Sequence, residues 1–252
     1  MERITSRKNA YVRHVRCLAT DAAYRREQGE TLCDGMKTLR EALHFGVPVR
    51  SVLWKDSAQE PEGLDCETQY LAPGELFDYA SPMVGSPGPL FTVPIPMTGG
   101  SPSPLRSAIV LESVQDPGNV GTVIRTANAF RMDAVILTGD CADPYHPKTV
   151  RASMGALFRQ RVLQMEREEL PGFLARQGLR LYGAALAEDA EDIRTLDLKD
   201  AAVAVGSEGR GLSPELLQMC EKKLIIPMNP DSESLNAAIA ASIIMWETSK
   251  LR

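Results

Sequence analysis

The second half of the chain alternates short, continuous apolar runs with helical patterns, and this alternation restricts the fold more than any other feature. Runs of Val, Ile, Ala and Leu without polar alternation are typical of strands that are buried on both faces of a sheet. Such runs occupy residues 108–114, 134–138, 179–186, 201–205 and 224–227. Helices are predicted between them, over 120–131, 148–159, 214–222 and 235–249. The pattern predicts an α/β fold in which helices flank a parallel sheet.

A proline-rich interval separates this region from the first part of the chain. Eight of the seventeen prolines lie between residues 73 and 104. Proline lacks an amide hydrogen and disfavours helical geometry in the residue before it, so this interval cannot form a helix. We therefore predict a first domain over 1–97, a linker over 98–106 and a second domain over 107–252.

The first domain is predicted to be small and mixed. Residues 13–26 and 36–45 have helical spacing of apolar residues, and Gly46 and Pro48 end the second helix. Residues 49–54 are predicted to form a strand, and 90–95 a last edge strand.

Composition excludes several classes of protein. With 44% hydrophobic and 24% charged residues in a chain of 252, a sizeable core is possible and disorder is not expected. The most apolar stretch, 237–246, is ten residues long and contains Ser242, whereas a membrane-spanning helix needs about 20. The first 16 residues contain no apolar run of the kind found in secretory signals. We expect a soluble, cytoplasmic protein.

The five cysteines argue against stabilising cross-links. Their number is odd and they lack paired close spacing. Neither a disulfide framework nor a zinc site is therefore expected, and we predict no metal.

The charge is unevenly distributed. The whole chain carries −5, but residues 1–50 contain ten Lys and Arg against six Asp and Glu, and so carry +4. Phosphate binding depends on local positive patches rather than on net charge. The same residues could instead coat a solvated helix face, so charge alone leaves both interpretations open.

Three strand–helix junctions contain unusual residues at the carboxyl ends of predicted strands, where ligands gather in open α/β sheets. In the first junction, Asp116-Pro-Gly-Asn119 forces a turn, and we expect Asn119 to cap a helix that begins at Val120. Arg125 projects away from the apolar face of that helix. Taken singly, Asn119 could be only a cap and Arg125 only a surface charge.

The second junction is rich in glycine. Gly206, Gly209 and Gly211 allow the backbone to approach a ligand closely, and Ser213 followed by Pro214 is a strong helix start. The spacing is neither the Rossmann fingerprint nor a Walker loop. It is consistent with a ligand-binding loop or with a tight strand–helix turn.

The third junction leads into a helix of small residues. Ser232 or Ser234 is expected to cap this helix, whose first turns contain mostly alanine. Asn236 is predicted in the first turn, where asparagine is unfavourable unless its side chain makes polar contacts.

Taken in this order, the three junctions resemble the three motifs of the SpoU (TrmH-like) RNA 2′-O-ribose methyltransferases, within the SPOUT superfamily. The matching segments are Asp116-Pro-Gly-Asn-Val-Gly through Arg125, Gly206-Ser-Glu-Gly-Arg-Gly-Leu-Ser213, and Ile226-Pro-Met through Ser234-Leu-Asn236. The resemblance covers residues 106–252. Residues 4–9 and 33–37 are similar to the substrate-binding domain, of the ribosomal-protein L30e type, that precedes many members.

The resemblance implies a fold and a cofactor. The second domain would contain a deep trefoil knot, a rare exception to the usual rules of chain topology. S-adenosylmethionine would bind in a pocket built by the knotted loops, and the protein would form a homodimer with its active site near the subunit interface. By position in the motifs, the cofactor contacts would be Gly206, Ile226, Leu235, Thr138, Gly139 and Met228.

The resemblance also implies catalytic residues, namely Arg125, Asn119, Glu208, Ser234 and Asn236. A family member is expected to orient a ribose 2′-hydroxyl against a sulfonium methyl group. Neutralising an arginine at pH 7 would cost about 7.5 kcal/mol, so we expect Arg125 to act as a cation that binds phosphate and stabilises a developing alkoxide. Asn119 and Asn236 would position Arg125 and the ribose, Glu208 would hold Arg125 or a group of the partner subunit, and Ser234 would orient the hydroxyl.

The RNA-binding residues are expected to be Arg7, Lys8, Arg13, Lys148 and Arg151. Structured RNA, 23S ribosomal more than transfer RNA, is the expected substrate. His146 lies in a proline-flanked loop, and we expect it to be structural rather than a general base.

Two alternative functions remain: a transfer-RNA methyltransferase, and a catalytically silent RNA-binding or ribosome-assembly module. A classical Rossmann methyltransferase or dehydrogenase is excluded by the missing glycine fingerprint.

Overall fold

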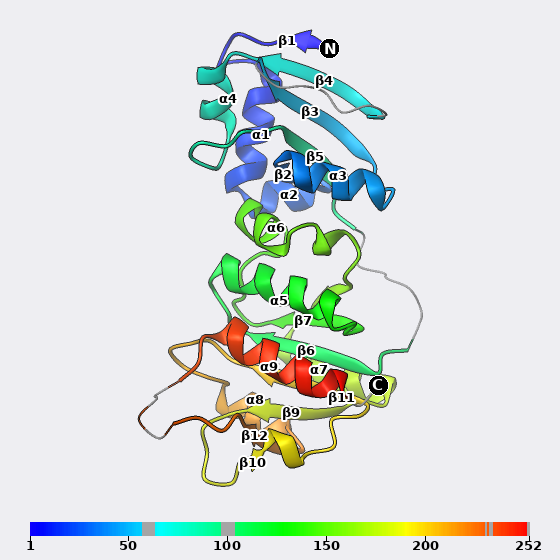
Figure 1. Cartoon of the computed structure of the whole chain (residues 1–252), viewed down its shortest axis with the longest axis vertical. Coiled ribbons are helices and arrows are strands. Elements are labelled where there is room, and N and C mark those ends of the chain that lie inside the picture. Colours follow the sequence, from blue (N-terminus) through cyan, green and yellow to red (C-terminus); the bar gives the residue numbers. More distant parts are fainter. Residues whose placement is uncertain (57–63, 97–103, 230, 232–233, 251–252) are drawn as a thin grey trace. The chain divides into compact units, whose positions relative to one another are not determined.

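The chain folds into two compact units in the computed structural model, which describes residues 1–56, 64–96, 104–229, 231 and 234–250 (Figure 1). One unit comprises Met1–Met97 together with Asp143–Phe158, and the other comprises Thr98–Ala142 and Arg159–Arg252. Most of the expected linker, 98–103, lies outside the described residues. The fold therefore consists of two α/β units whose sequences are interleaved.

Segment 143–158 belongs to the first unit, although the domain prediction gave it to the second. The guanidinium of Arg25 donates to Asp143 Oδ2 over 2.6 and 2.9 Å, and the Thr31 hydroxyl donates to the carbonyl of Tyr145 over 2.7 Å. Arg25 is buried, so its charge needs this partner. Contacts between residues so distant in sequence leave no local periodicity, and sequence patterns could not reveal them.

The first unit is built on a five-stranded sheet of order β1-β4-β3-β5-β2. Its strands are β1 (Glu2–Arg3), β2 (Glu30–Asp34), β3 (Val49–Lys55), β4 (Cys66–Ala72) and β5 (Leu90–Pro94), and its α-helices are α1 (Ala10–Thr20), α2 (Ala22–Gln28), α3 (Met36–His44), α4 (Gly74–Ala80) and α6 (Pro147–Ser153). The prediction that residues 73–104 contain no helix is wrong: α4 fits between Pro73 and Pro82 and itself contains no proline. The strand predicted at 90–95 is confirmed, but its edge position is wrong. β5 pairs antiparallel with both β2 and β3. Because Pro94 is its last residue, the amides before it remain available for pairing on both sides.

The helix predicted over 13–26 is two helices. The Asp21 side chain accepts from the amides of Ala23 and Tyr24, which starts α2 directly after α1 ends. In α1, Val12, Val15 and Leu18 are fully buried and pack in the core cluster with α4 and the sheet.

The second unit contains seven strands, all parallel, in the order β10-β12-β9-β11-β6-β7-β8. The strands are β6 (Ser107–Glu112), β7 (Ala134–Thr138), β8 (Val162–Gln164), β9 (Arg180–Ala184), β10 (Glu191–Asp192), β11 (Ala201–Val205) and β12 (Lys222–Ile225), and the α-helices are α5 (Pro117–Ala129), α7 (Leu170–Gln177), α8 (Pro214–Met219) and α9 (Ala237–Ser249). The predicted parallel sheet flanked by helices is confirmed. β8 and β10 are too short to give an apolar run, and the sequence did not reveal them.

The helices of the second unit form two layers (Figure 1). Ala108 and Val110 of β6 pack with Leu174 of α7 and Leu216 of α8 in one core cluster. α5 and α9 pack against each other, and α9 contacts β6 and β11 on the opposite face of the sheet. Successive residues of each central strand thus face opposite helix layers, which explains why the strands are apolar throughout.

Within the described part of the chain, no helix is long and apolar enough to cross a lipid bilayer. All five cysteines are free thiols.

Candidate functional site

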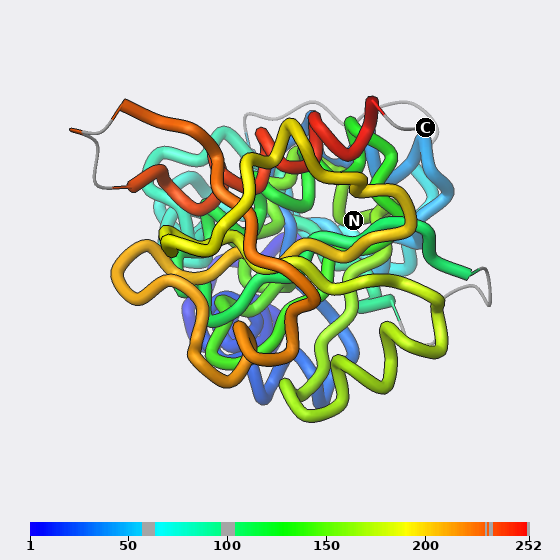
Figure 2. Tube along the Cα trace, turned by 90° about the horizontal axis from the view of Figure 1, so that it is seen from below, coloured from blue at the N-terminus to red at the C-terminus, as the bar shows by residue number. Residues whose placement is uncertain are grey.

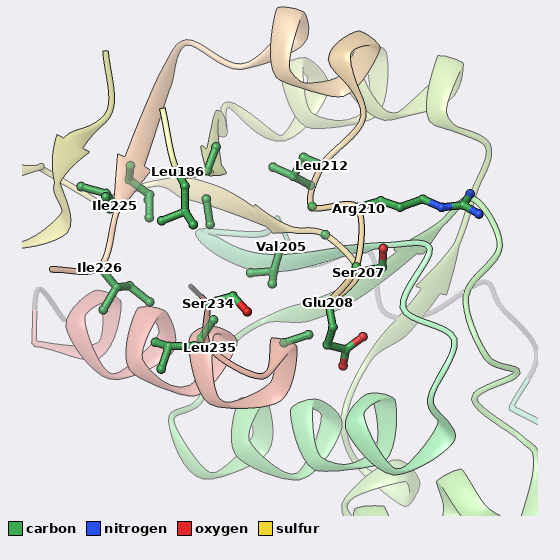
Figure 3. A pocket seen from close by; sticks show the side chains of 18 of the residues that line it. Leu186, Val205, Ser207, Glu208, Arg210, Leu212, Ile225, Ile226, Ser234 and Leu235 are labelled. Atoms are coloured by element: carbon green, nitrogen blue, oxygen red, sulfur yellow. The ribbon is translucent and has the colours of Figure 1, made fainter. Parts of the chain in front are cut away.

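A cavity of about 530 Å³ opens at the carboxyl edge of the second unit's sheet. It lies where β9, β11 and β12 end, and the segments that follow β11 and β12 leave the sheet on the same side (Figure 2). Its walls are mostly apolar: Leu186, Ile225, Ile226 and Leu235 point into it (Figure 3). A volume of this size, with apolar walls and few polar groups, is typical of pockets for small organic ligands, which span about 300–1,000 Å³.

The loop that follows β11 forms one wall of the cavity and folds tightly on itself. The amide of Gly211 donates to the carbonyl of Ser207 over 2.9 Å, and these two residues form an isolated antiparallel bridge. A Cβ atom on Gly206 would lie 2.0 Å from the Gly211 carbonyl carbon. Glycine is therefore required at 206 because the loop backbone approaches itself too closely for any side chain.

Side chains from all three junctions meet beside this loop. The side-chain amide of Asn119 donates a hydrogen bond to the Glu208 carboxylate. The side-chain amide of Asn236 donates to Asn119 Oδ1 over 3.2 Å. Glu208 lines the cavity, and its carboxylate points toward the helices α5 and α9 (Figure 3). Asn119 therefore links Glu208 and Asn236 in one hydrogen-bonded group.

The helix caps differ from those predicted. Asp116, not Asn119, caps α5, because its side chain accepts from the Asn119 amide over 2.9 Å and the helix begins at Pro117. Asn236 caps α9 by accepting from the amides of Ala238 and Ile239. Of the two residues predicted for that cap, Ser232 lies outside the described residues and Ser234 precedes Asn236. Asn119 is thereby left available for the contacts with Glu208 and Asn236.

Four of the six predicted cofactor contacts line the cavity: Gly206, Ile226, Met228 and Leu235. Ser234 lines it too. Thr138 and Gly139 do not line it. Thr138 is buried at the end of β7. Gly139 follows with φ +65°, and a Cβ atom on it would lie 2.6 Å from Ser113 Oγ.

Arg125 lies on the exposed surface of α5 and does not line the cavity. It is six residues after Asn119, about 9 Å along the helix axis. Among the described residues no hydrogen bond or ion pair joins it to Glu208, which bonds to Asn119 instead. The catalytic role of Arg125 remains a prediction.

Sequence reasoning missed two parts of the site. Ala184, Ala185 and Leu186 line the cavity at the end of β9; the rule that ligands bind at strand ends could have identified them, since this strand was predicted. Glu112, at the end of β6, is buried and accepts two hydrogen bonds from Ser213. A lone acidic residue at a strand end carries no sequence signal for such a contact.

Cys220 packs close to Gly183, at 2.9 Å from the position that a Cβ there would occupy. Burial raises the pKa of its thiol to about 11. The thiol is therefore protonated near neutral pH and is not a nucleophile.

All five predicted RNA-binding residues belong to the first unit and have exposed side chains. They are Arg7, Lys8, Arg13, Lys148 and Arg151.

His146 caps α6, where its Nδ1 accepts from the amide of Lys148 over 3.2 Å. Burial, followed by the nearby charge of Arg25, lowers the pKa of His146. This contact at the start of α6 agrees with the structural role predicted for His146, whose exclusion as a general base stays a prediction.

A family model described as "SpoU rRNA Methylase family" matches residues 106–246. The chain belongs to this family. It is 32% identical to the 23S rRNA (guanosine(2553)-2′-O)-methyltransferase RlmP of Bacillus subtilis, over 98% of both chains. It is 29% identical to a 23S rRNA (uridine(2479)-2′-O)-methyltransferase of Streptomyces viridochromogenes, over 99% of this chain and 92% of that one.

Among solved structures, the crystal structure of an AdoMet-bound rRNA methyltransferase from Sinorhizobium meliloti superposes with a TM-score of 0.85. Sequence identity is 26%, and the match covers 99% of this chain and 97% of the other. The similarity to these relatives therefore spans both units.

Proposed function

We propose that the chain transfers a methyl group from S-adenosylmethionine to a ribose 2′-hydroxyl of 23S ribosomal RNA. The observation that carries the proposal is the hydrogen-bonded group Glu208–Asn119–Asn236 beside the cavity, which unites one residue of each family motif. The two relatives named as 23S rRNA 2′-O-methyltransferases, similar over nearly the whole chain, support this substrate class.

The cavity fits the cofactor. S-adenosylmethionine carries a flat adenine ring, which suits the apolar walls formed by Leu186, Ile225 and Ile226, and polar groups that backbone amides and carbonyls at strand ends can bind. We assign Gly206, Ile226, Met228 and Leu235 to hold it. When bound, it supplies an electrophilic methyl group on a sulfonium sulfur. Thr138 and Gly139, which lie outside the cavity, are not part of this assignment.

The polar residues beside the cavity would orient the RNA ribose. Asn236 is fixed because it caps α9, and Asn119 is fixed because it bonds to both Asn236 and Glu208. A rigid array of this kind can hold a hydroxyl in the geometry that an in-line displacement requires. Ser234 would orient the 2′-hydroxyl. The Arg125 guanidinium would bind the adjacent phosphate and stabilise negative charge on the 2′-oxygen as its proton leaves to water.

A homodimer would complete this site. Ile239 and Trp246 of α9 are each 51% exposed, at positions seven apart on one face of the helix. The centroids of the Phe130 and Trp246 rings are 5.6 Å apart. Such an apolar stripe beside the site is suited to a second copy of the chain. In this arrangement Arg125, which is on the same helix as Asn119, would act at the subunit boundary.

The first unit would bind the RNA. Its five exposed basic residues, together with the +4 charge of residues 1–50, support this assignment in a chain whose net charge is −5. The knotted topology, the L30e-type fold of this unit and a cytoplasmic location, where ribosomal RNA is modified, belong to the same proposal.

The proposal is tested with radiolabelled S-adenosylmethionine and, in separate reactions, ribosomal RNA and transfer RNA from a strain that lacks the gene. We expect label on a single ribose 2′-oxygen of 23S RNA, found by mapping 2′-O-methyl sites. Label on transfer RNA alone would replace the substrate class, and cofactor binding without transfer to either RNA would indicate a silent RNA-binding module.

A further inference from the structure

We propose that Glu112 is a positioning residue that holds loop 206–212 in the shape that receives the cofactor. The inference rests on the proposed function, because it takes the cavity to be the S-adenosylmethionine site. Glu112 does not line the cavity, and it acts through Ser213.

The carboxylate of Glu112 accepts two hydrogen bonds from Ser213 and forms an ion pair with Arg167. Glu112 Oε2 accepts from the Ser213 amide over 2.7 Å, and Oε1 accepts from the Ser213 hydroxyl over 2.7 Å. Arg167 Nε, in the short 3₁₀ helix Arg167–Glu169, lies 2.8 Å from Oε1. Only 2% of Glu112 is exposed, so this charge is nearly desolvated. Hydrogen bonds to a buried charge are stronger than those between neutral groups, and leaving one unmade is costly.

The position of Glu112 in the sheet explains why it controls the loop. β6 and β11 are neighbours, and Leu111 is the partner of Val205 in their register. The loop leaves the sheet after Val205, lines the cavity from Gly206 to Leu212, and returns at Ser213 to Glu112, the residue after Leu111. Both ends of the loop are therefore attached to adjacent points of the same sheet edge.

The attached loop determines two features of the site. Its close turn, in which Gly211 bonds back to Ser207, presents the backbone of Gly206 to the cavity. The same turn directs Glu208 toward Asn119. A loop released at Ser213 would sample other conformations. S-adenosylmethionine would then have to order the loop as it binds, and the entropy lost in ordering it would lower the affinity.

The test substitutes Glu112 without changing its size. In Glu112→Gln, one oxygen acceptor becomes an amide donor that faces a donor of Ser213 or the charged Arg167 guanidinium, and the ion pair is lost. We expect S-adenosylmethionine to bind about 10- to 100-fold more weakly by calorimetric titration. KM for the cofactor should rise accordingly, while kcat at saturating cofactor changes less than about threefold. Glu215→Gln is the matched control, because Glu215 is the exposed second partner of Arg167 at 3.8 Å, and it should bind as the wild type does.

A measurement without cofactor separates this inference from the proposed function. In the ligand-free protein, hydrogen exchange at the Gly211 and Ser213 amides should be faster in Glu112→Gln than in the wild type, whereas amides in β11 should be unchanged. If the wild type does not bind S-adenosylmethionine, the proposed function is overturned. The hydrogen-exchange comparison in the ligand-free protein still tests whether Glu112 holds the loop. Unchanged affinity and unchanged exchange in a folded Glu112→Gln would overturn the inference.

Ser213→Ala provides a second variant if Glu112→Gln does not fold. It removes the hydroxyl donor to Glu112, together with the oxygen that caps α8 by accepting from the Leu216 amide, and keeps the backbone donor to Glu112. We therefore expect a smaller loss of affinity. Where both single variants fold, the double variant should lose less than the product of the two separate losses, because the residues act through one contact. Two results would indicate that Glu112 serves stability alone. The first is a loss of affinity in the double variant equal to the product of the two single losses, and the second is a smaller fraction of binding-competent protein whose affinity for S-adenosylmethionine is unchanged.

Discussion

The side-chain amide of Asn236 donates to the side-chain oxygen of Asn119 over 3.2 Å, although the two residues are 117 positions apart in the sequence. The contact joins the start of α9 to the start of α5. Because Asn119 also donates to Glu208, it is the one residue of the three that bonds to both others. The first prediction concerns this bridging residue.

Asn119→Ala should lower the rate of methyl transfer about 100-fold or more, because Glu208 and Asn236 would lose their common partner and the ribose would lose its orientation. Initial rates on 23S ribosomal RNA measure the effect. Asn128→Ala is the control on the same helix, since it removes only an exposed hydrogen bond to Arg159. Rates within threefold of the wild type for Asn119→Ala would contradict the role of this group.

Gly206→Ala should weaken cofactor binding at least tenfold, because a Cβ at this position would lie 2.0 Å from the Gly211 carbonyl carbon and the loop would have to open. Overpacking of this kind also costs about 1–3 kcal/mol of stability. The matched control is Gly209→Ala in the same loop, where a Cβ meets no atom within 4 Å. Calorimetric titration of both variants measures the difference. Equal affinities would show that the close turn does not shape the cavity.

Much of the second unit could be predicted from sequence because its determinants are local. Apolar runs fix the central strands, and the order Ser213-Pro214 fixes the start of α8. The caps at Asp116 and Asn236 were predicted incorrectly, because several neighbouring residues could each cap the same helix and tertiary contacts decide among them. The grouping of segment 143–158 with the first unit rests on the contact of Arg25 with Asp143, and no local pattern encodes it.

Charge reversal of Arg7, Lys8 and Arg13 to Glu should weaken RNA binding and flatten its dependence on salt, because fewer counterions would be released from the RNA. Each lost phosphate contact lowers the slope of log K against log salt by about 0.7–0.9. Filter binding at several salt concentrations measures the slope. Arg176→Glu, on the exposed face of α7 in the second unit, is the control. A slope unchanged by the triple reversal would place the RNA elsewhere.

The stability of the protein should fall as the pH is lowered through the range in which His146 titrates. Burial and Arg25 lower its pKa below the ordinary value of 6.5, so the unfolded chain binds the proton more readily than the folded one. The free energy of unfolding should therefore decrease as the pH falls below about 6.5. Protonation would also remove the Nδ1 acceptor that caps α6.

Denaturant titrations between pH 5 and 8 measure this contribution. His146→Asn keeps a capping side chain but cannot titrate, so the loss of stability at low pH should be smaller in this variant. Identical pH profiles for the variant and the wild type would show that other groups account for the change.

Trp246→Glu should shift the protein toward monomers, because it places a charge in the apolar stripe of α9 that we assign to the dimer interface. Methyl transfer should fall with dimer content. Val84→Glu is the control, since Val84 is fully exposed in the first unit. Sedimentation velocity measures the oligomeric state, and a wild type that is monomeric at micromolar concentration would contradict the dimer.

A crystal structure of the full chain grown with S-adenosylmethionine tests the central claim most directly. We predict density for the cofactor in the cavity bounded by Gly206, Ile226 and Leu235, with the hydrogen bonds of Asn119 to Glu208 and Asn236 intact. An empty cavity at saturating cofactor, or cofactor bound at another place on the protein, would contradict the account.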